Sequence, residues 1–520
     1  MSDSPDPDSA GPETLRDLYA RHAADPEDYD TNRKLGMLLS GIRKTQIHGE
    51  PFLLRALAHK AAAGQMRDHQ AVAMLDRLAM LLMAKGDYAA AEDIAAQLVT
   101  LAPGVPELWF RWGDVLFRLG RVAEASDAFA RTLTRMRESA RAAAARRGGP
   151  VTHLLSPHKV IARYFGETAA KLDLYLKARE LGLLDRADPV LLAPAADVAN
   201  PALFDYWGRH ARVVRDPAEI AQVQADLADS QVYLDYIPLP DGRTLHRDVA
   251  HRVVQALWEA AGRGPLLTLD PGHRRAGRER LARAGLPEDA WFVCLHVREA
   301  GFFDEDVAWS NNRHRNARVE TYLPAVAEVV ARGGHVVRIG DPTMTPLPGV
   351  PGLIDYAHGG DDLRADWMDL VCVAEARFYL GMASGPSSVA VNFGVPTLGT
   401  NWFPLGPWPY CAGDIFIHKR LRDTATGRFL GIAESLAPPL FSAMAPLYFQ
   451  ARGLEPVDNT ADEIRAATRE MLDRLDGTWT DTAEDDARQA RYRALADPHG
   501  VGLTPRLGRD FLAAHPELLD

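Results

Sequence analysis

Short apolar runs alternate with helical patterns in the second half of the chain. Four runs rich in Val, Ile, Leu and Phe cover Trp291 to Glu299, His335 to Asp341, Arg377 to Ser384 and Val395 to Asn401. Amphipathic stretches, or Gly and Pro, separate them. This spacing is typical of βαβ units on a parallel, doubly wound sheet. A less regular mixture of strand-like and helical patterns from Val151 to about Gly264 predicts a second α/β lobe before it.

The N-terminal part has helical periodicity from Glu13 to about Ala145, with an internal repeat. Leu75 aligns with Trp109 and Gly86 with Gly120, in both cases 34 positions apart. A period of this length, with small residues where two helices meet, resembles the tetratricopeptide repeat. About three stacked repeats are normally needed for stability, so we expect the pair to dock on flanking helices or on the next domain. A Gly-Gly-Pro break before Val151 suggests a helical module that can be separated from the rest.

Composition narrows the class of protein. A chain of 520 residues is too long for a single core, and 47% apolar with 25% charged residues is typical of a globular protein. The net charge of −11 argues against general binding of nucleic acid. The three cysteines predict buried thiols in a reducing compartment. The acidic, Pro-rich start does not look like a signal peptide, and no apolar run approaches the ~20 residues of a membrane span, so we expect a cytoplasmic protein.

Polar residues appear where each apolar run ends. In open α/β sheets the ligand crevice lies outside the carboxyl ends of the strands. His296 and Arg298 lie two apart on the first run, which directs both side chains to the same side of a strand. The Arg298 guanidinium is a planar fork suited to a diphosphate. The alternative is a structural ion pair at a sheet edge. The same geometric rule adds Arg338 and Asp341 on the second run.

The sequence SGPSS at the end of the third run is a second candidate. Ser384 and Gly385 predict a tight exit from the strand, and Pro386 is favoured at the first helical position. Ser387 and Ser388 then place hydroxyls beside the unpaired N–H groups of a helix start, which form a ready anion site. An ordinary serine and proline cap remains the alternative.

Taken in order, the motifs HVRE, GGHVVRIGD, IDYA, YLGMASGPSS and FGVPT resemble a group of bacterial glycosyltransferases. These are similar, around the H-x-R strand, to α-fucosyltransferases of the two-lobed GT-B fold. The resemblance covers residues 190–421 well and the tail weakly. It implies a transferase with two facing Rossmann-like lobes, a nucleotide sugar as co-substrate in the C-terminal lobe, and no obligatory metal or other cofactor.

The resemblance also implies roles for individual residues. Arg298 would neutralise the β-phosphate as it leaves, His296 would help to shape the same pocket, and Ser384, Gly385, Ser387 and Ser388 would lie at the diphosphate. Asp355 and Tyr356 would contact base and ribose. Arg338 and Asp341 are further donor-binding candidates, added from their place at a strand end and not from the resemblance. Lys419 is another cation candidate, although a solvated lysine is the simpler interpretation.

Two acidic features of the sequence have more than one interpretation. Asp304, Glu305 and Asp306 form a D-x-D sequence, with which another transferase fold holds Mn²⁺ or Mg²⁺, but an acidic loop produces it by chance. Because an inverting displacement needs a general base for the acceptor hydroxyl, we assign Glu299 or a carboxylate of this loop to that role and predict no metal site.

The predicted fold class is therefore α/β, with two Rossmann-like lobes preceded by an all-α tetratricopeptide-like module. The expected divisions are a disordered tail (1–12), the helical module (13–150), an acceptor lobe (151–280), a nucleotide-sugar lobe (281–440) and a helical extension (441–520).

The expected function is transfer of a sugar to a glycan or protein acceptor in surface polysaccharide assembly, with a protein partner on the repeats. One alternative is a scaffold that binds a nucleotide sugar without turnover. Another is a sugar-nucleotide epimerase, for which no suitable acid and base pair is found.

Overall fold

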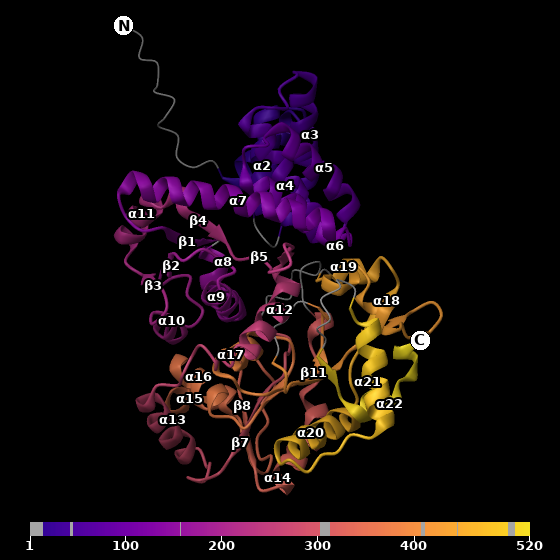
Figure 1. Ribbon diagram of the computed structural model, residues 1–520. Helices are drawn as coiled ribbons and strands as arrows, with labels where there is room; N and C mark the ends of the chain where they lie inside the picture. The colour runs from indigo at the N-terminus through magenta and orange to yellow at the C-terminus, as the bar shows by residue number, and fades with distance from the viewer. Residues whose placement is uncertain are drawn as a thin grey trace.

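Helices occupy the first part of the chain and two parallel sheets the remainder (Figure 1). The computed structural model describes residues 14–41, 45–156, 158–301, 313–406, 411–444, 446–497 and 505–520. None of the helices in these ranges is long and apolar enough to cross a membrane.

The helical module consists of antiparallel pairs. Its helices are α1 (Leu15–Ala24), α2 (Tyr29–Gly41), α3 (Glu50–Ala62), α4 (His69–Lys85), α5 (Tyr88–Leu101), α6 (Pro106–Arg118) and α7 (Val122–Arg147), with a 3-10 turn η1 (Gln46–Gly49). Gly86 and Gly120, the equivalent glycines of the repeat, have φ angles of +80° and +79° and follow α4 and α6. Only glycine adopts this left-handed conformation readily, which explains why both helices end there.

The first lobe contains a four-stranded parallel sheet in the order β3-β2-β1-β4. Its strands are β1 (Thr152–Ser156), β2 (Asp188–Leu192), β3 (Arg212–Val214) and β4 (Gln231–Tyr233), and its helices are α8 (His158–Arg163), α9 (Phe165–Glu180), α10 (Pro201–Trp207), α11 (Pro217–Asp226) and α12 (Arg247–Ala260). The next helix, α13 (Pro271–Arg283), packs on the second lobe, with Gly277 against Val371. A hairpin of β5 (Tyr236–Pro238) and β6 (Thr244–His246) precedes α12.

The second lobe contains a seven-stranded parallel sheet in the order β15-β12-β11-β10-β7-β8-β9. Its strands are β7 (Phe292–His296), β8 (His335–Arg338), β9 (Leu353–Ile354), β10 (Tyr379–Gly381), β11 (Thr397–Trp402), β12 (Ile415–His418) and β15 (Arg506–Leu507), and helices α14 (Leu323–Ala331), α15 (Gly360–Leu363), α16 (Asp366–Ala374) and α17 (Gly385–Phe393) connect them. Because the chain starts at β7, moves outward through β8 and β9 and then returns to β10, the order reverses between β7 and β10. The predicted fold class, helices followed by two parallel α/β lobes, is confirmed.

The C-terminal part packs against the second lobe. It contains the β13 (Arg420–Asp423) and β14 (Leu454–Val457) hairpin, α18 (Ile432–Leu436), α19 (Pro446–Gln450), α20 (Ala461–Leu475), α21 (Ala483–Leu495) and α22 (Arg509–Ala514). Helix α20 begins with a capping box: the Glu463 N–H donates to Thr460 Oγ1 at 3.2 Å, and the Thr460 N–H donates to Glu463 Oε2 at 2.6 Å.

The helical module is not a separate body. Phe129 and Met136 of α7 belong to the same buried core as the first lobe, and the Thr244 N–H donates to Ser126 Oγ at 2.8 Å. At its other side, Arg118 donates to the carbonyl of Ser442 at 3.1 Å. Removal of the module would uncover core side chains of the first lobe, and this packing argues against the separability that the Gly-Gly-Pro break suggests, which stays a prediction.

The two lobes meet where α9 and α17 begin. A Cβ atom added to Gly166 would lie 3.0 Å from Gly385 Cα, so neither position has room for a side chain. Further along, Asn392 Nδ2 donates to the carbonyl of Ala169 at 3.3 Å. Close backbone approach at these residues holds the lobes together beside the point where the second sheet reverses its order.

Candidate functional site

Two of the predicted residues come together where β7 and β10 end. The strands pair with His296 opposite Gly381, and Ser384 follows three residues later. Ser384 Oγ lies 3.1 Å from His296 Nδ1 and 3.1 Å from the Tyr379 hydroxyl. Burial, with Arg298 nearby, lowers the pKa of His296 to about 3, so the ring is neutral at physiological pH. Its second nitrogen can then donate or accept one hydrogen bond, depending on the tautomer.

Arg298 leaves β7 at the same place. Its backbone N–H donates to Met382 Sδ at 3.3 Å, and its carbonyl accepts from the Ala317 N–H at 3.0 Å. These bonds fix the main chain on both sides of the sheet reversal. Burial lowers the pKa of the guanidinium to about 10, so Arg298 remains charged at neutral pH.

Two further cations join Arg298. Arg315 is 6% exposed, lies in the 3-10 turn η3 (Arg313–Arg315) and donates to the carbonyl of Ala383 at 2.8 Å. Lys419, 2% exposed, directly follows β12; its Nζ donates to the carbonyl of Asn316 and to Asp458 Oδ1, each at 2.6 Å. The expectation that Lys419 is solvated is wrong. The cation candidate is thus a buried one, and its place directly after β12 agrees with the strand-end rule that selected Arg338.

The three cations interact electrostatically. Burial lowers the pKa of Arg315, and the charge of Arg298 lowers it further. Burial also lowers the pKa of Lys419; Asp458 opposes this shift, while Arg315 and Arg298 add to it. Like charges that repel one another in a poorly hydrated place are stabilised by a bound anion. We call His296, Arg298, Arg315, Ser384 and Lys419 the switch-point cluster.

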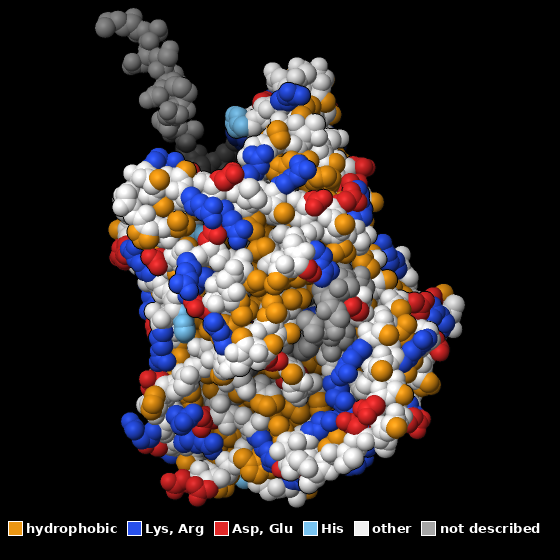
Figure 2. Space-filling model, in the orientation of Figure 1, with side chains coloured by type: hydrophobic (Ala, Val, Ile, Leu, Met, Phe, Trp, Pro, Cys, Tyr) orange, Lys and Arg blue, Asp and Glu red, His pale blue; other side chains and the backbone are white. Residues whose placement is uncertain are grey.

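The outer surface offers no comparable concentration of positive charge on the face drawn in Figure 2. Lys and Arg side chains there are interspersed with Asp and Glu, and hydrophobic side chains gather near the centre of the view. The cluster is therefore an interior feature rather than the edge of a broad basic surface on that face. Within the ranges that the structure describes, no group of three or more His, Cys, Asp or Glu could hold a metal ion. The D-x-D sequence at residues 304–306 lies outside those ranges.

The other residues of the serine motif have local or interfacial contacts. Ser387 Oγ donates to the carbonyl of Ser384 at 2.7 Å and accepts from its N–H at 3.3 Å, which is an ordinary helix cap. Gly385 packs on Gly166 of the other lobe. Ser388 is 1% exposed, and its hydroxyl has no hydrogen-bond partner in the described part of the chain. It shares the face of α17 that Gly385 and Asn392 turn to α9. The structure thus places these serines beside the cluster rather than within it.

Arg338 forms a buried ion-pair network. It is fully buried, with Nη2 2.8 Å from Glu299 Oε1 and Nη1 3.2 Å from Asp355 Oδ1. The second oxygen of Glu299 accepts from the Thr345 N–H at 2.6 Å. Arg338 binds both Glu299 and Asp355 inside the fold. Arg338 and Asp355 therefore do not face a ligand as expected, and Glu299 is not placed to act as the base.

Asp341 and Tyr356 also make internal contacts. Asp341 Oδ1 accepts from the Thr343 N–H at 2.9 Å and so shapes the turn after β8. Tyr356 is fully buried, and its hydroxyl donates to Asp369 Oδ1 at 2.7 Å. A ring enclosed in this way does not face a base or a ribose.

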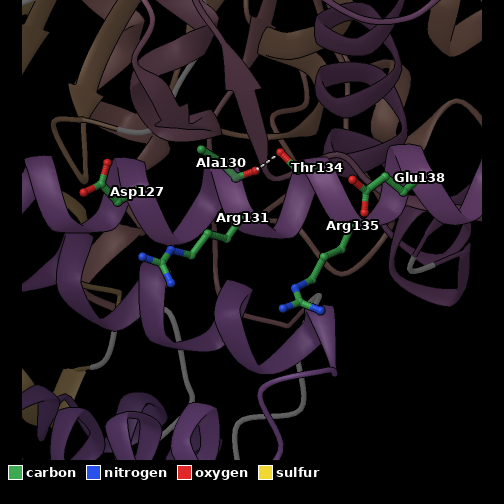
Figure 3. Close-up of a pocket in the computed structure, with 6 residues that line it drawn as sticks. All are labelled: Asp127, Ala130, Arg131, Thr134, Arg135 and Glu138. Carbon is green, nitrogen blue, oxygen red and sulfur yellow. Dashed lines mark hydrogen bonds between the residues drawn. The ribbon is translucent and has the colours of Figure 1, made fainter.

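A groove on the helical module is separate from these strand ends (Figure 3). One face of α7 lines it with Asp127, Ala130, Arg131, Thr134, Arg135 and Glu138, around a volume of about 590 Å³. The guanidinium of Arg131 lies over the Trp109 ring at 4.7 Å, and Thr134 Oγ1 donates to the carbonyl of Ala130 at 2.9 Å. Two arginines and two carboxylates line it, so it lacks the cationic character of the switch-point cluster.

Buried histidines make stability depend on pH. Burial lowers the pKa of His153 to about 4, and that of His251, His296 and His314 to about 3, from 6.5. Their contribution to stability is full above about pH 6.5 and is lost as the pH falls toward 3, because the unfolded chain binds protons that the folded chain does not. Within this window, each ring should lower the free energy of unfolding by about 1.4 kcal/mol for every unit by which the pH falls.

We therefore expect the thermal midpoint to fall steadily between about pH 7 and pH 5, with a smaller slope in His153→Asn. Circular dichroism melts across this range measure it. Midpoints that do not change with pH would show that these rings are already charged in the folded protein.

Comparisons with known proteins agree with part of this organisation. The tetratricopeptide repeat family model matches residues 82–147. No curated protein matches the chain. Among solved structures, the glycosyl transferase family 9 protein from Veillonella parvula is 11% identical with a TM-score of 0.29, over 48% of this chain and 80% of that one. A mutant O-GlcNAc transferase from Thermobaculum terrenum is 15% identical with a TM-score of 0.22, over 92% and 98%. These TM-scores are too low to carry an inference about this chain.

The family model confirms the repeat predicted from the 34-residue period. The resemblance to fucosyltransferases is not shown by any of these comparisons and stays a prediction.

Proposed function

We propose that the protein transfers a sugar from a nucleotide-sugar donor to a glycan or protein acceptor. The observation that carries the proposal is the convergence of Arg298, Arg315 and Lys419 with His296 and Ser384 where the second sheet reverses its order. This is the place at which doubly wound sheets bind ligands. A diphosphate is an anion of suitable charge for three cations.

The chemistry follows from charge. As the bond between the sugar and the diphosphate breaks, negative charge increases on the β-phosphate. Arg298 can bind two phosphate oxygens with its planar fork, and Lys419 adds a point charge. Preorganised cations in a poorly hydrated site stabilise developing charge more strongly than they would in water. Neutral His296 can hydrogen-bond a substrate hydroxyl without adding repulsion.

The first lobe and the helical module have separate roles in this proposal. The first lobe would hold the acceptor, and the helical module would dock a protein partner, for which the α7 groove is one available surface. The same cations would make an obligatory metal unnecessary for leaving-group stabilisation. Glu299 is engaged by Arg338 and Thr345, so we do not assign it as the base.

The test is time-dependent release of the nucleotide from a panel of GDP, UDP and CMP sugars, with glycan acceptors and EDTA present. GDP and UDP sugars release a nucleoside diphosphate, and CMP sugars release the monophosphate. We expect one donor to be consumed over many turnovers. Arg428→Ala is the matched control, because Arg428 forms an exposed ion pair with Glu434. Saturable binding of a donor without its consumption would favour a scaffold instead, and activity that EDTA abolishes and Mn²⁺ restores would contradict metal independence.

A further inference from the structure

A backbone irregularity lies next to the switch-point cluster. Along the β11 and β12 pair, Gly399 is opposite Phe416 and Trp402 is opposite His418, so β11 contains one extra residue. Asn401, in this bulge, has a φ angle of +47° and is the one non-glycine residue with a positive φ in the described part of the chain. This conformation is unfavourable for a residue with a side chain and persists where surrounding contacts compensate for it. Bulges of this kind often occur beside functional sites, where they redirect a chain.

The compensating contacts form a reciprocal pair. The Asn401 N–H donates to Asn459 Oδ1 at 2.5 Å, and the Asn459 N–H donates to Asn401 Oδ1 at 2.6 Å. Asn401 Nδ2 also donates to the Tyr322 hydroxyl at 3.1 Å. Both asparagines are buried. These three directional bonds of two buried side chains leave this junction of β11 with the C-terminal part little freedom.

The pair holds Lys419 from two sides. Asn459 Nδ2 donates to the carbonyl of His418 at 3.0 Å, which fixes the residue before Lys419. Asp458, the residue before Asn459, accepts from Lys419 Nζ at 2.6 Å. On the other strand, the carbonyl of Trp402, the residue after Asn401, accepts from the Lys419 N–H at 3.3 Å.

We propose that Asn401 and Asn459 are positioning residues that set the Lys419 ammonium for binding a diphosphate; this rests on the proposed function. A lysine side chain is a point charge on a flexible stem, so the position of its charge depends on the groups that anchor it. Loss of the asparagine pair loosens both anchors of Lys419 and leaves Arg298 and Arg315 without a correctly placed third cation. The two residues act through Lys419 and do not touch the ligand.

The test is calorimetric titration of the full chain with inorganic pyrophosphate. We expect Asn459→Ala to weaken binding about tenfold, and Lys419→Ala to weaken it at least as much. In the Lys419→Ala background, Asn459→Ala should weaken pyrophosphate binding no further. A residue with a merely structural role would weaken binding in both backgrounds. Asn401→Gly is the second variant, because glycine accepts a positive φ and keeps the bulge while the side-chain bonds are lost. The matched control is Asn32→Ala in α2, where a buried asparagine donates to the carbonyls of Pro26 and Asp28.

Each result has a defined meaning. Binding by Asn459→Ala and Asn401→Gly that equals the wild type overturns the positioning role and leaves the proposed function intact. Equal weakening by Asn459→Ala with and without Lys419 also overturns it, because the effect would then not pass through the lysine. Absence of pyrophosphate binding by the wild type contradicts the anion site on which both proposals depend.

Discussion

Replacing Arg298 by alanine should lower turnover by about 10²–10³-fold, corresponding to ~3–4 kcal/mol of lost transition-state stabilisation. The physical reason is the position of Arg298 directly beyond β7, at the reversal of the sheet, where its charge acts on that of Arg315. Arg298→Lys keeps the charge but loses the fork, so its turnover should lie between those of the wild type and Arg298→Ala.

Folding should change little in both variants. The backbone bonds of Arg298 to Met382 and Ala317 do not involve its side chain. Removing its charge also relieves the repulsion that contributes to the lowered pKa of Arg315. The measurement is kcat together with the thermal midpoint for the wild type and both variants. Near-normal turnover in Arg298→Ala, or collapse of its melting transition, would assign this arginine a structural role.

Arg338→Met should lower stability, in contrast to the Arg298 variants, which should lower turnover. The expected loss in the free energy of unfolding is ~3–5 kcal/mol. Arg338 is fully buried and is the ion-pair partner of both Glu299 and Asp355. Methionine fills similar volume but leaves two carboxylates in the interior without their cation. Breaking one side of a buried pair costs far more than the pair contributes by itself.

Urea unfolding measures this loss, with Arg428→Ala as control. Arg428 and Glu434 have side chains 58% and 50% exposed, so the control should change stability by ~0–1 kcal/mol. If Arg338→Met unfolds like the wild type yet fails to bind or turn over a donor, the ligand role predicted from sequence would be restored and the structural role contradicted.

The two arginines show what sequence could and could not provide. Apolar periodicity predicted the strands that carry them, and the carboxyl-end rule correctly placed both at strand ends. The rule does not show which polar side chains pair with each other. Glu299, Arg338 and Asp355 come from separate segments, and only the folded chain brings them within ion-pair distance. His296 and Ser384, in contrast, follow neighbouring strands, and their contact was foreseeable from topology.

Arg315 and Lys419 illustrate two different failures. Arg315 lies in an irregular turn with no periodic signal, so nothing in the sequence relates it to Ala383. Lys419 follows a strand and satisfied the rule, but its charge suggested a solvated residue. Its burial depends on Asp458 and on the carbonyl of Asn316, both distant in sequence. Docking of the helical module on the next domain was expected from the small number of repeats, but the contact of Ser126 with Thr244 that contributes to it is long-range and could not be predicted.

Calorimetric binding of nucleoside diphosphates, compared with the corresponding nucleosides, measures whether the protein recognises the diphosphate itself. If the switch-point cluster binds the diphosphate of a donor, one diphosphate of the panel should bind at least about 10²-fold more tightly than its nucleoside. That difference should shrink at high salt and largely disappear in Arg298→Ala. A nucleoside that binds as tightly as its diphosphate, or a difference that survives in Arg298→Ala, would show that the switch-point cluster does not bind the diphosphate.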